Sequence, residues 1–75
     1  MVKVLLFGQL AEICGQRLLL LDLPDTQSVS AHLSAAFPGF EKQVFAIAVN
    51  QKLVSENTAL SAGDELALMP PYSGG

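Results

Sequence analysis

This sequence has few cationic residues, one cysteine, one histidine and no tryptophan. Its 75 residues hold four Lys and Arg against seven Asp and Glu, which gives a formal net charge of −3. Such a chain has no basic stripe that could release counterions from a phosphate backbone, so nucleic acid is not expected as a partner. The single cysteine, Cys14, cannot close an intramolecular disulfide, which predicts a reducing compartment.

Long hydrophobic runs are also missing. The longest apolar stretch, residues 44–49, is far below the about 20 residues that a membrane-spanning helix needs, and the first residues do not resemble a secretory signal. We therefore expect a cytoplasmic protein with no membrane segment. The length allows one small domain with a radius of gyration of about 11 Å, and it leaves little room for a deep substrate cleft.

Side chains for catalysis and metal binding are equally sparse. Nucleophilic catalysis usually pairs Ser, Cys or Thr with a base, and the only imidazole is that of His32. We expect His32 on the exposed side of a helix and Cys14 in the core, so they form no dyad. One Cys, one His and scattered carboxylates do not approach ligand spacing, and no metal site is predicted. The pair Gly74-Gly75 lacks the strand-loop-helix context of a phosphate-binding loop.

The apolar pattern that is present predicts strands and two helices. Strand composition occurs in residues 2–7, 17–23, 44–49, 52–54 and 65–69, with a tight turn at Asn50-Gln51. A short helix is indicated by Leu10, Ile13 and Cys14, and it ends at Gly15.

The main helix is predicted to begin with Ser28 as its N-cap and to end at Pro38-Gly39. Its apolar face is expected to comprise Val29, Leu33, Ala36 and Phe37, with Ser30, His32 and Ser34 toward solvent.

The order of these elements is strand, short helix, strand, helix and three strands. One main helix must then cover one face of a mixed sheet of about five strands, which is an α+β domain. The pattern predicts a β-grasp, or ubiquitin-like, fold with the first and last strands side by side in the centre. We expect this domain to span residues 1–69 and a flexible, extended tail to span residues 70–75.

The tail has an unusual composition. Pro70-Pro71 favours a stiff, extended exit from the last strand, and Tyr72-Ser73 leads to two residues without side chains. Six residues at about 3.3 Å each reach roughly 20 Å, enough to cross an interface into another protein. Because Gly has no Cβ, Gly74-Gly75 could pass through a narrow tunnel. The alternative is a terminus that is simply disordered.

A carboxylate at Gly75 would be ionised at neutral pH and would be a poor electrophile until it is activated. The sequence contains no nucleotide-binding motif, so an activating site would belong to a partner. The chain is therefore expected to have no active site and to bind no cofactor of its own.

Several segments together resemble one family over the whole chain. They are Val4-Leu5-Leu6-Phe7, the stretch from Gln9 to Gly15, Ala48-Val49-Asn50-Gln51, Gly63-Asp64-Glu65 and the tail Pro70-Pro71-Tyr72-Ser73-Gly74-Gly75. The sequence resembles the small subunit of molybdopterin synthase, the sulfur-carrier family of molybdenum-cofactor biosynthesis. Two positions depart from the family pattern: Ala11, where Arg is frequent, and Tyr72, where a small aliphatic residue is common.

The resemblance implies a reaction cycle at Gly75. An activating enzyme of the ubiquitin E1 type would adenylate Gly75 with ATP and magnesium, and a sulfur donor protein would displace AMP to leave a thiocarboxylate. The tail would then enter the large subunit of the synthase, in a two-plus-two heterotetramer, and supply sulfur for dithiolene formation. Phe7, Leu68 and Met69, with the Tyr72 ring, are candidates for the apolar docking face. Core packing is the alternative for Phe7, Leu68 and Met69, because hydrophobic strand residues usually face inward.

Two other functions use the same tail. A ubiquitin-like modifier would be joined to lysines of other proteins through Gly75, and a sulfur carrier of another pathway, such as thiamin synthesis, would also end in two glycines. The pair Pro70-Pro71 fits the thiamin carrier less well.

Overall fold

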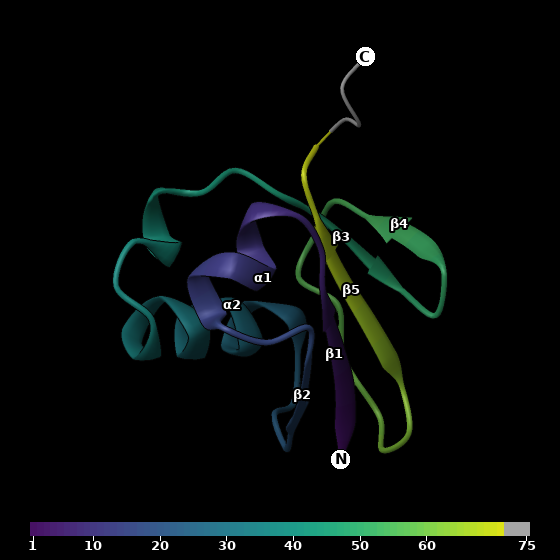
Figure 1. The fold of residues 1–75 in the computed structure, drawn as a ribbon. Coiled ribbons are helices and arrows are strands. Elements are labelled where there is room, and N and C mark those ends of the chain that lie inside the picture. The colour runs from purple at the N-terminus through teal and green to yellow at the C-terminus, as the bar shows by residue number, and fades with distance from the viewer. Residues whose placement is uncertain (72–75) are drawn as a thin grey trace.

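Five strands and three helical segments make up residues 1–71, the part of the chain that the computed structural model describes (Figure 1). The strands are β1 (Val2–Leu6), β2 (Leu18–Leu21), β3 (Ala46–Val49), β4 (Lys52–Val54) and β5 (Glu65–Met69). The helices are α1 (Gln9–Cys14), α2 (Thr26–Ala36) and the short 3₁₀ helix η1 (Phe40–Lys42). Of the predicted tail, residues 70–75, the part from Tyr72 to Gly75 lies outside the described residues.

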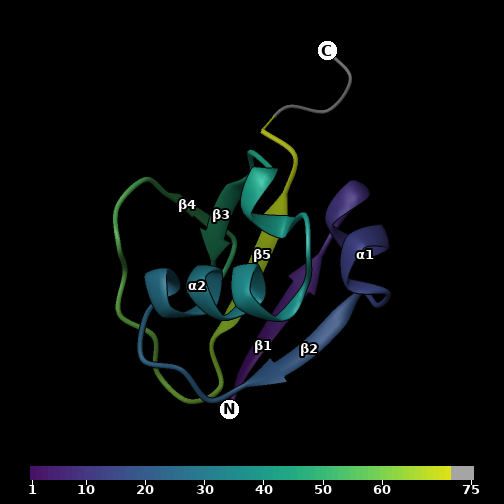
Figure 2. The same ribbon diagram turned by 90° about the vertical axis from the view of Figure 1, so that its left-hand side faces the viewer.

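The strands form one mixed sheet in the order β2-β1-β5-β3-β4. The first and last strands, β1 and β5, are parallel neighbours, and the other pairs in the sheet are antiparallel. Helices α1 and α2 lie on the same side of this sheet (Figures 1 and 2). The predicted α+β class and β-grasp arrangement are thus confirmed, and the radius of gyration is 11.3 Å.

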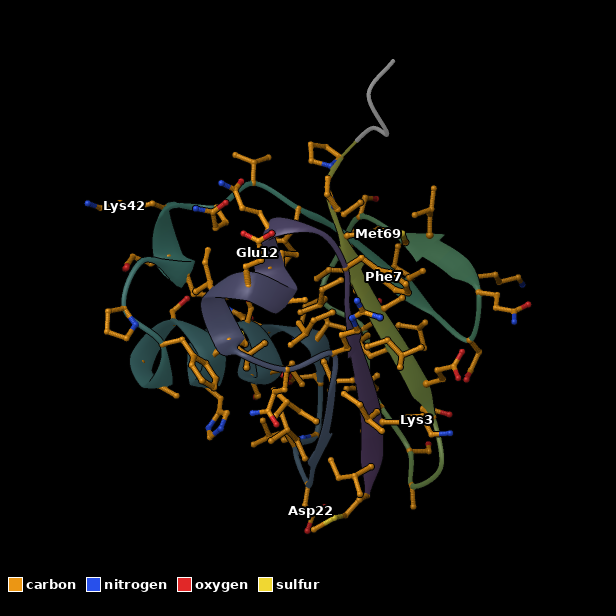
Figure 3. All side chains as sticks on the ribbon, in the orientation of Figure 1. Lys3, Phe7, Glu12, Asp22, Lys42 and Met69 are labelled. Atoms are coloured by element: carbon orange, nitrogen blue, oxygen red, sulfur yellow. The ribbon has the colours of Figure 1, made fainter. Side chains whose placement is uncertain are left out.

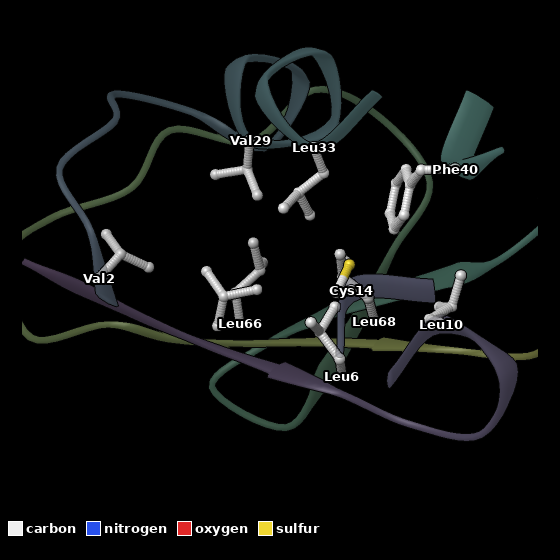
Figure 4. Packing of buried hydrophobic residues seen from close by; sticks show 10 residues of the cluster. Val2, Leu6, Leu10, Cys14, Val29, Leu33, Phe40, Leu66 and Leu68 are labelled. Carbon is white, nitrogen blue, oxygen red and sulfur yellow. The ribbon is translucent and has the colours of Figure 1, made fainter. Parts of the chain in front are cut away.

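The core lies between the helices and one face of the sheet (Figure 4). Alternate residues of β1 and β5 point into it, so that Val4 and Leu66 are fully buried beneath Val29 and Leu33 of α2. The short helix contributes Leu10 and Cys14, and Cys14 is buried as predicted. Gly15 ends α1 in the left-handed region at φ 73°, as its position in the sequence predicts.

The predicted N-cap of the main helix was wrong. Helix α2 begins at Thr26, and its cap is Asp25, whose Oδ1 accepts a hydrogen bond of 2.8 Å from the Ser28 N–H. Asp25 has extended backbone angles, whereas Ser28 is already helical. The Thr26 hydroxyl bonds to a distant loop instead of capping the helix. It accepts a hydrogen bond from the Thr58 N–H at 3.0 Å and donates one to Asn57 Oδ1 at 3.2 Å. These bonds join the start of α2 to the loop before β5.

Smaller differences concern the ends of elements and the faces of α2. The third strand begins at Ala46 rather than Val44, because Val44 is exposed and Phe45 packs against Phe40, with 5.2 Å between the ring centroids. On α2, Ala36 is exposed instead of buried, while Ser30 and Ser34 are half-buried; His32 is exposed as predicted. Helix η1 was not predicted.

The turn between β3 and β4 was predicted correctly. Asn50 and Gln51 have φ of 50° and 71°, as a tight hairpin turn requires. Asn50 also bridges to the turn before β5, because its Nδ2 donates to Asp64 Oδ1 at 3.1 Å and its Oδ1 accepts from the Glu65 N–H at 3.0 Å. The hairpin is therefore held against the start of β5.

Candidate functional site: the end of β5 and the uncovered sheet face

The candidate site begins where β5 ends. The strand stops at Met69 and continues into the exposed Pro70 and Pro71. Just before this point the Phe7 N–H donates a 3.1 Å hydrogen bond to the Leu68 carbonyl, which extends the β1–β5 pairing by one residue. Phe7 thus lies beside the end of β5, and Figure 3 shows the Phe7 and Met69 side chains close to each other.

Gly8, which follows β1, lies close to Pro70, which follows β5. Its backbone has φ of 58°, and a Cβ added there would lie 3.2 Å from Cγ of Pro70. A shallow groove adjoins Gly8 and is lined by residues from the end of β1, α1 and the start of β2, among them Phe7, Ala11, Glu12 and Arg17. A side chain at position 8 would therefore crowd Pro70, the first residue of the tail.

The sheet face opposite the helices is largely apolar, with Lys3 and Glu65 at the end where β1 and β5 begin. We call it the open face and define it by Leu5, Phe7, Leu18, Leu20, Leu53, Ala67 and Met69. The strand registers place these residues on one side, since Leu5 is opposite Leu18 and Ala67, and Ala46 is opposite Met69. Four large side chains remain exposed there: Phe7 (47%), Leu18 (46%), Leu20 (58%) and Leu53 (74%). Clustered exposed apolar groups of this kind mark interaction surfaces.

The structure separates the three predicted docking residues. Phe7 is half-exposed and Met69 is half-buried, and both belong to the open face. Leu68 is 1% exposed and packs in the core, so in this structure it provides no docking surface. Core packing was the alternative to docking that the sequence left open for Leu68. The tail residues Pro70 and Pro71 are exposed, whereas Tyr72, Ser73, Gly74 and Gly75 lie outside the described residues.

Leu18, Leu20 and Leu53 were not identified from the sequence as surface residues. The run Leu18-Leu19-Leu20-Leu21 has no polar residue, so it carries no alternation that would show which leucines face the helices. The pairing of β2 with β1 supplies this information: Leu19 is opposite the buried Val4, and Leu20 is opposite the exposed Lys3.

Two carboxylates, those of Asp25 and Asp64, accept hydrogen bonds from backbone N–H groups. The Ser28 hydrogen bonds lower the pKa of Asp25, and the Ser61 backbone N–H together with Asn50 lowers the pKa of Asp64. Burial raises the pKa of the Cys14 thiol.

Within residues 1–71 no three His, Cys, Asp or Glu side chains are grouped to hold a metal ion. No helix in this part of the chain has the length and hydrophobicity to span a membrane.

A family model described as the ThiS family matches residues 4–75. The chain belongs to the ThiS family.

Individual relatives cover the chain from end to end. The molybdopterin synthase sulfur carrier subunit of Escherichia coli is 36% identical, with all of both chains covered. Small archaeal modifier protein 1 of Haloferax volcanii is also 36% identical, covering 93% of this chain and 95% of the relative. A crystal structure of that modifier superposes with a TM-score of 0.82 at 28% identity over 95% of this chain and 97% of the other. These structural neighbours support the ubiquitin-like fold.

One solved structure contains a second protein. It is a complex of subunits 1 and 2 of the molybdopterin-converting factor from Helicobacter pylori. The matched chain is 32% identical, with a TM-score of 0.75, and the match covers 99% of this chain and 97% of that one. In that relative, the same fold binds a partner subunit.

Proposed function

We propose that this chain is the sulfur carrier subunit of a molybdopterin synthase. The observation that carries the proposal is the full-length similarity to a carrier subunit of that name, which includes the two terminal glycines of the family match. The described residues are consistent with a carrier that docks on partners, because Phe7, Leu18, Leu20 and Leu53 leave large apolar side chains exposed.

In this proposal the chemistry occurs at Gly75 and is catalysed by partners. An E1-like enzyme uses ATP and magnesium to join the Gly75 carboxylate to AMP, and pyrophosphate leaves. A sulfur donor protein then attacks the acyl adenylate with a persulfide and AMP leaves; a thiol reduces the resulting acyl disulfide, which gives the Gly75 thiocarboxylate and a disulfide. Sulfur on an acyl carbon is a softer and stronger nucleophile than carboxylate oxygen. Two such sulfur transfers supply the dithiolene, and hydrolysis returns Gly75 to the carboxylate.

The open face is the proposed docking surface for the large subunit. Phe7 and Met69 lie next to the point where the chain leaves β5, so a partner that covers them would receive the tail directly. Pro70-Pro71 stiffens the first part of the tail, and Tyr72-Ser73 continues toward the partner's active site. Gly74 has no side chain to obstruct passage into that site. The proposed assembly is a heterotetramer of two carriers and two large subunits.

A reconstituted sulfur transfer tests the proposal. The thiocarboxylated chain is mixed with the large subunit and the cyclic pyranopterin phosphate, and dithiolene product is measured. We expect product with the full chain and none after deletion of Gly75, while both proteins melt at nearly the same temperature. Product formation by the truncated chain would refute the assigned role of Gly75. A large fall in melting temperature would instead make the tail a structural element.

Protein modification is the second candidate function, favoured by the Haloferax relative named a modifier protein. It requires the same activated Gly75 but ends in an isopeptide bond to a lysine. Proteolytic digestion of cellular proteins followed by mass spectrometry distinguishes the two. Gly-Gly remnants on lysines that vanish when this chain is absent would establish conjugation; their absence together with a thiocarboxylate would support sulfur carriage alone.

A further inference from the structure

Strand β2 forms one edge of the sheet, and apart from its short length it carries none of the usual protection of such an edge. Its four residues, Leu18 to Leu21, include no charge, proline or bulge. Natural edge strands are usually interrupted by such features, because free N–H and C=O groups pair readily with another strand. Figure 2 shows β2 beside β1 at the edge of the sheet, and in the strand order of the described residues no further strand follows it.

The hydrogen-bond pattern shows which backbone groups are free. The Leu6 N–H donates to the Arg17 carbonyl at 2.9 Å, and bonded pairs alternate along an antiparallel ladder. Leu19 and Leu21 therefore bond to β1, whereas Leu18 and Leu20 direct their N–H and C=O groups away from the sheet. Within residues 1–71 no other backbone or side-chain group bonds to these two residues. Leu18 is also 46% exposed and Leu20 58% exposed, both on the open face.

We propose that β2 pairs with β2 of a second copy of this chain in an antiparallel, two-fold symmetric dimer. The register places Leu19 opposite Leu19 of the second copy, so that Leu18 and Leu20 of each copy exchange hydrogen bonds with Leu20 and Leu18 of the other. The free N–H and C=O groups of Leu18 and Leu20 are then hydrogen-bonded in both copies. Such a two-fold contact uses the same patch on both subunits.

Charge favours the antiparallel orientation of two identical strands. Arg17 precedes β2 and Asp22 follows it. In the proposed register, Arg17 of one copy lies one position from Asp22 of the second copy, whereas parallel pairing would place like charges together. The leucine side chains of the two copies would extend the open face across the contact.

The described part of the tail, Pro70 and Pro71, leaves the sheet at the end of β5 and not at the centre of this contact. Leu20 is opposite Lys3, toward the start of β1, whereas β5 releases the tail beyond Leu68, at the other end of the sheet. The dimer is independent of the proposed sulfur transfer. One short strand per copy buries less than the about 1,200 Å² of standard interfaces, so the dimer is weak and forms at high concentration.

Sedimentation equilibrium and amide hydrogen exchange of the full chain test the dimer. Between about 10 µM and about 1 mM, we expect the mass to rise from the monomer value of 7.9 kDa toward twice that value. The Leu18 and Leu20 amides should become protected over the same range, while those of Leu19 and Leu21 are protected throughout. A constant monomer mass would overturn the proposal, and so would association without protection of Leu18 and Leu20.

A matched pair of variants locates the contact. Leu20→Lys, on β2, should raise the dissociation constant at least about tenfold, since a lysine on an edge strand opposes pairing. Leu53→Lys, on the opposite edge strand β4, should leave it unchanged. The reverse result would place the interface at β4 and refute the assignment. Deletion of Gly75 should not affect dimerisation, which separates this test from that of sulfur transfer.

Discussion

Replacement of Phe7 by alanine should weaken binding of the large subunit markedly. The ring is 47% exposed in the free chain. For a side chain of about 200 Å², this leaves about 95 Å² to be covered by a partner. At about 25 cal/mol per Å², and allowing for the area that alanine retains, the loss is about 2 kcal/mol, or about thirtyfold in dissociation constant.

Isothermal titration of the large subunit with each variant measures this loss. Phe37→Ala is the matched control, because Phe37 is also a partly buried phenylalanine but packs on the helix side of the core. Both variants should lose some stability through the part of the ring that is buried, and only Phe7→Ala should lose affinity. Wild-type affinity for Phe7→Ala, in a protein shown by circular dichroism to be folded, would refute the proposed docking surface.

Three further predictions concern the domain itself. Leu68→Ala should reduce the free energy of unfolding by about 2–5 kcal/mol, because a fully buried side chain is removed; a loss below about 1 kcal/mol in chemical denaturation would contradict its place in the core. Asp25→Ala should lower the stability of the domain by removing the cap of α2, whereas Asp25→Asn should restore most of the loss. The folded-state pKa of Asp25 lies below its ordinary value, so its stabilisation is complete above about pH 4 and is lost as the pH falls through the folded-state pKa. Thermal melts should accordingly show less acid sensitivity for Asp25→Asn than for the wild type. Cys14 should react slowly with alkylating reagents at neutral pH, because it is buried and its pKa is raised; rapid labelling of the folded protein would contradict this.

The fold could be predicted from the sequence because local signals and periodicity agreed. Gly15 and Pro38-Gly39 mark the ends of two helices, and Asn50-Gln51 marks the hairpin. The cap of α2 was harder to predict. Asp25 and Ser28 are both good capping residues, and the choice depends on Thr26 bonding to a loop about thirty residues later.

The candidate site could be predicted only in part for a similar reason. The unusual composition of the tail can be recognised in the sequence, whereas Phe7 and Met69 were named as docking candidates only through the family resemblance, with core packing as the alternative. The faces of Leu18 to Leu21 could not be assigned, because a run of identical residues contains no period and only pairing with β1 orients it. Likewise, Leu68 and Met69 are both apolar neighbours in sequence, and the register of β5 decides which is buried.

The most direct test of the proposed function is the mass of the chain after expression beside its activating enzyme and sulfur donor. We predict a gain equal to the replacement of one oxygen by sulfur, and fragmentation should place it on Gly75. Oxidation of Met1, Met69 or Cys14 adds nearly the same mass, so the position of the gain is decisive. A gain found only on those three residues, with an unchanged Gly75, would contradict sulfur carriage.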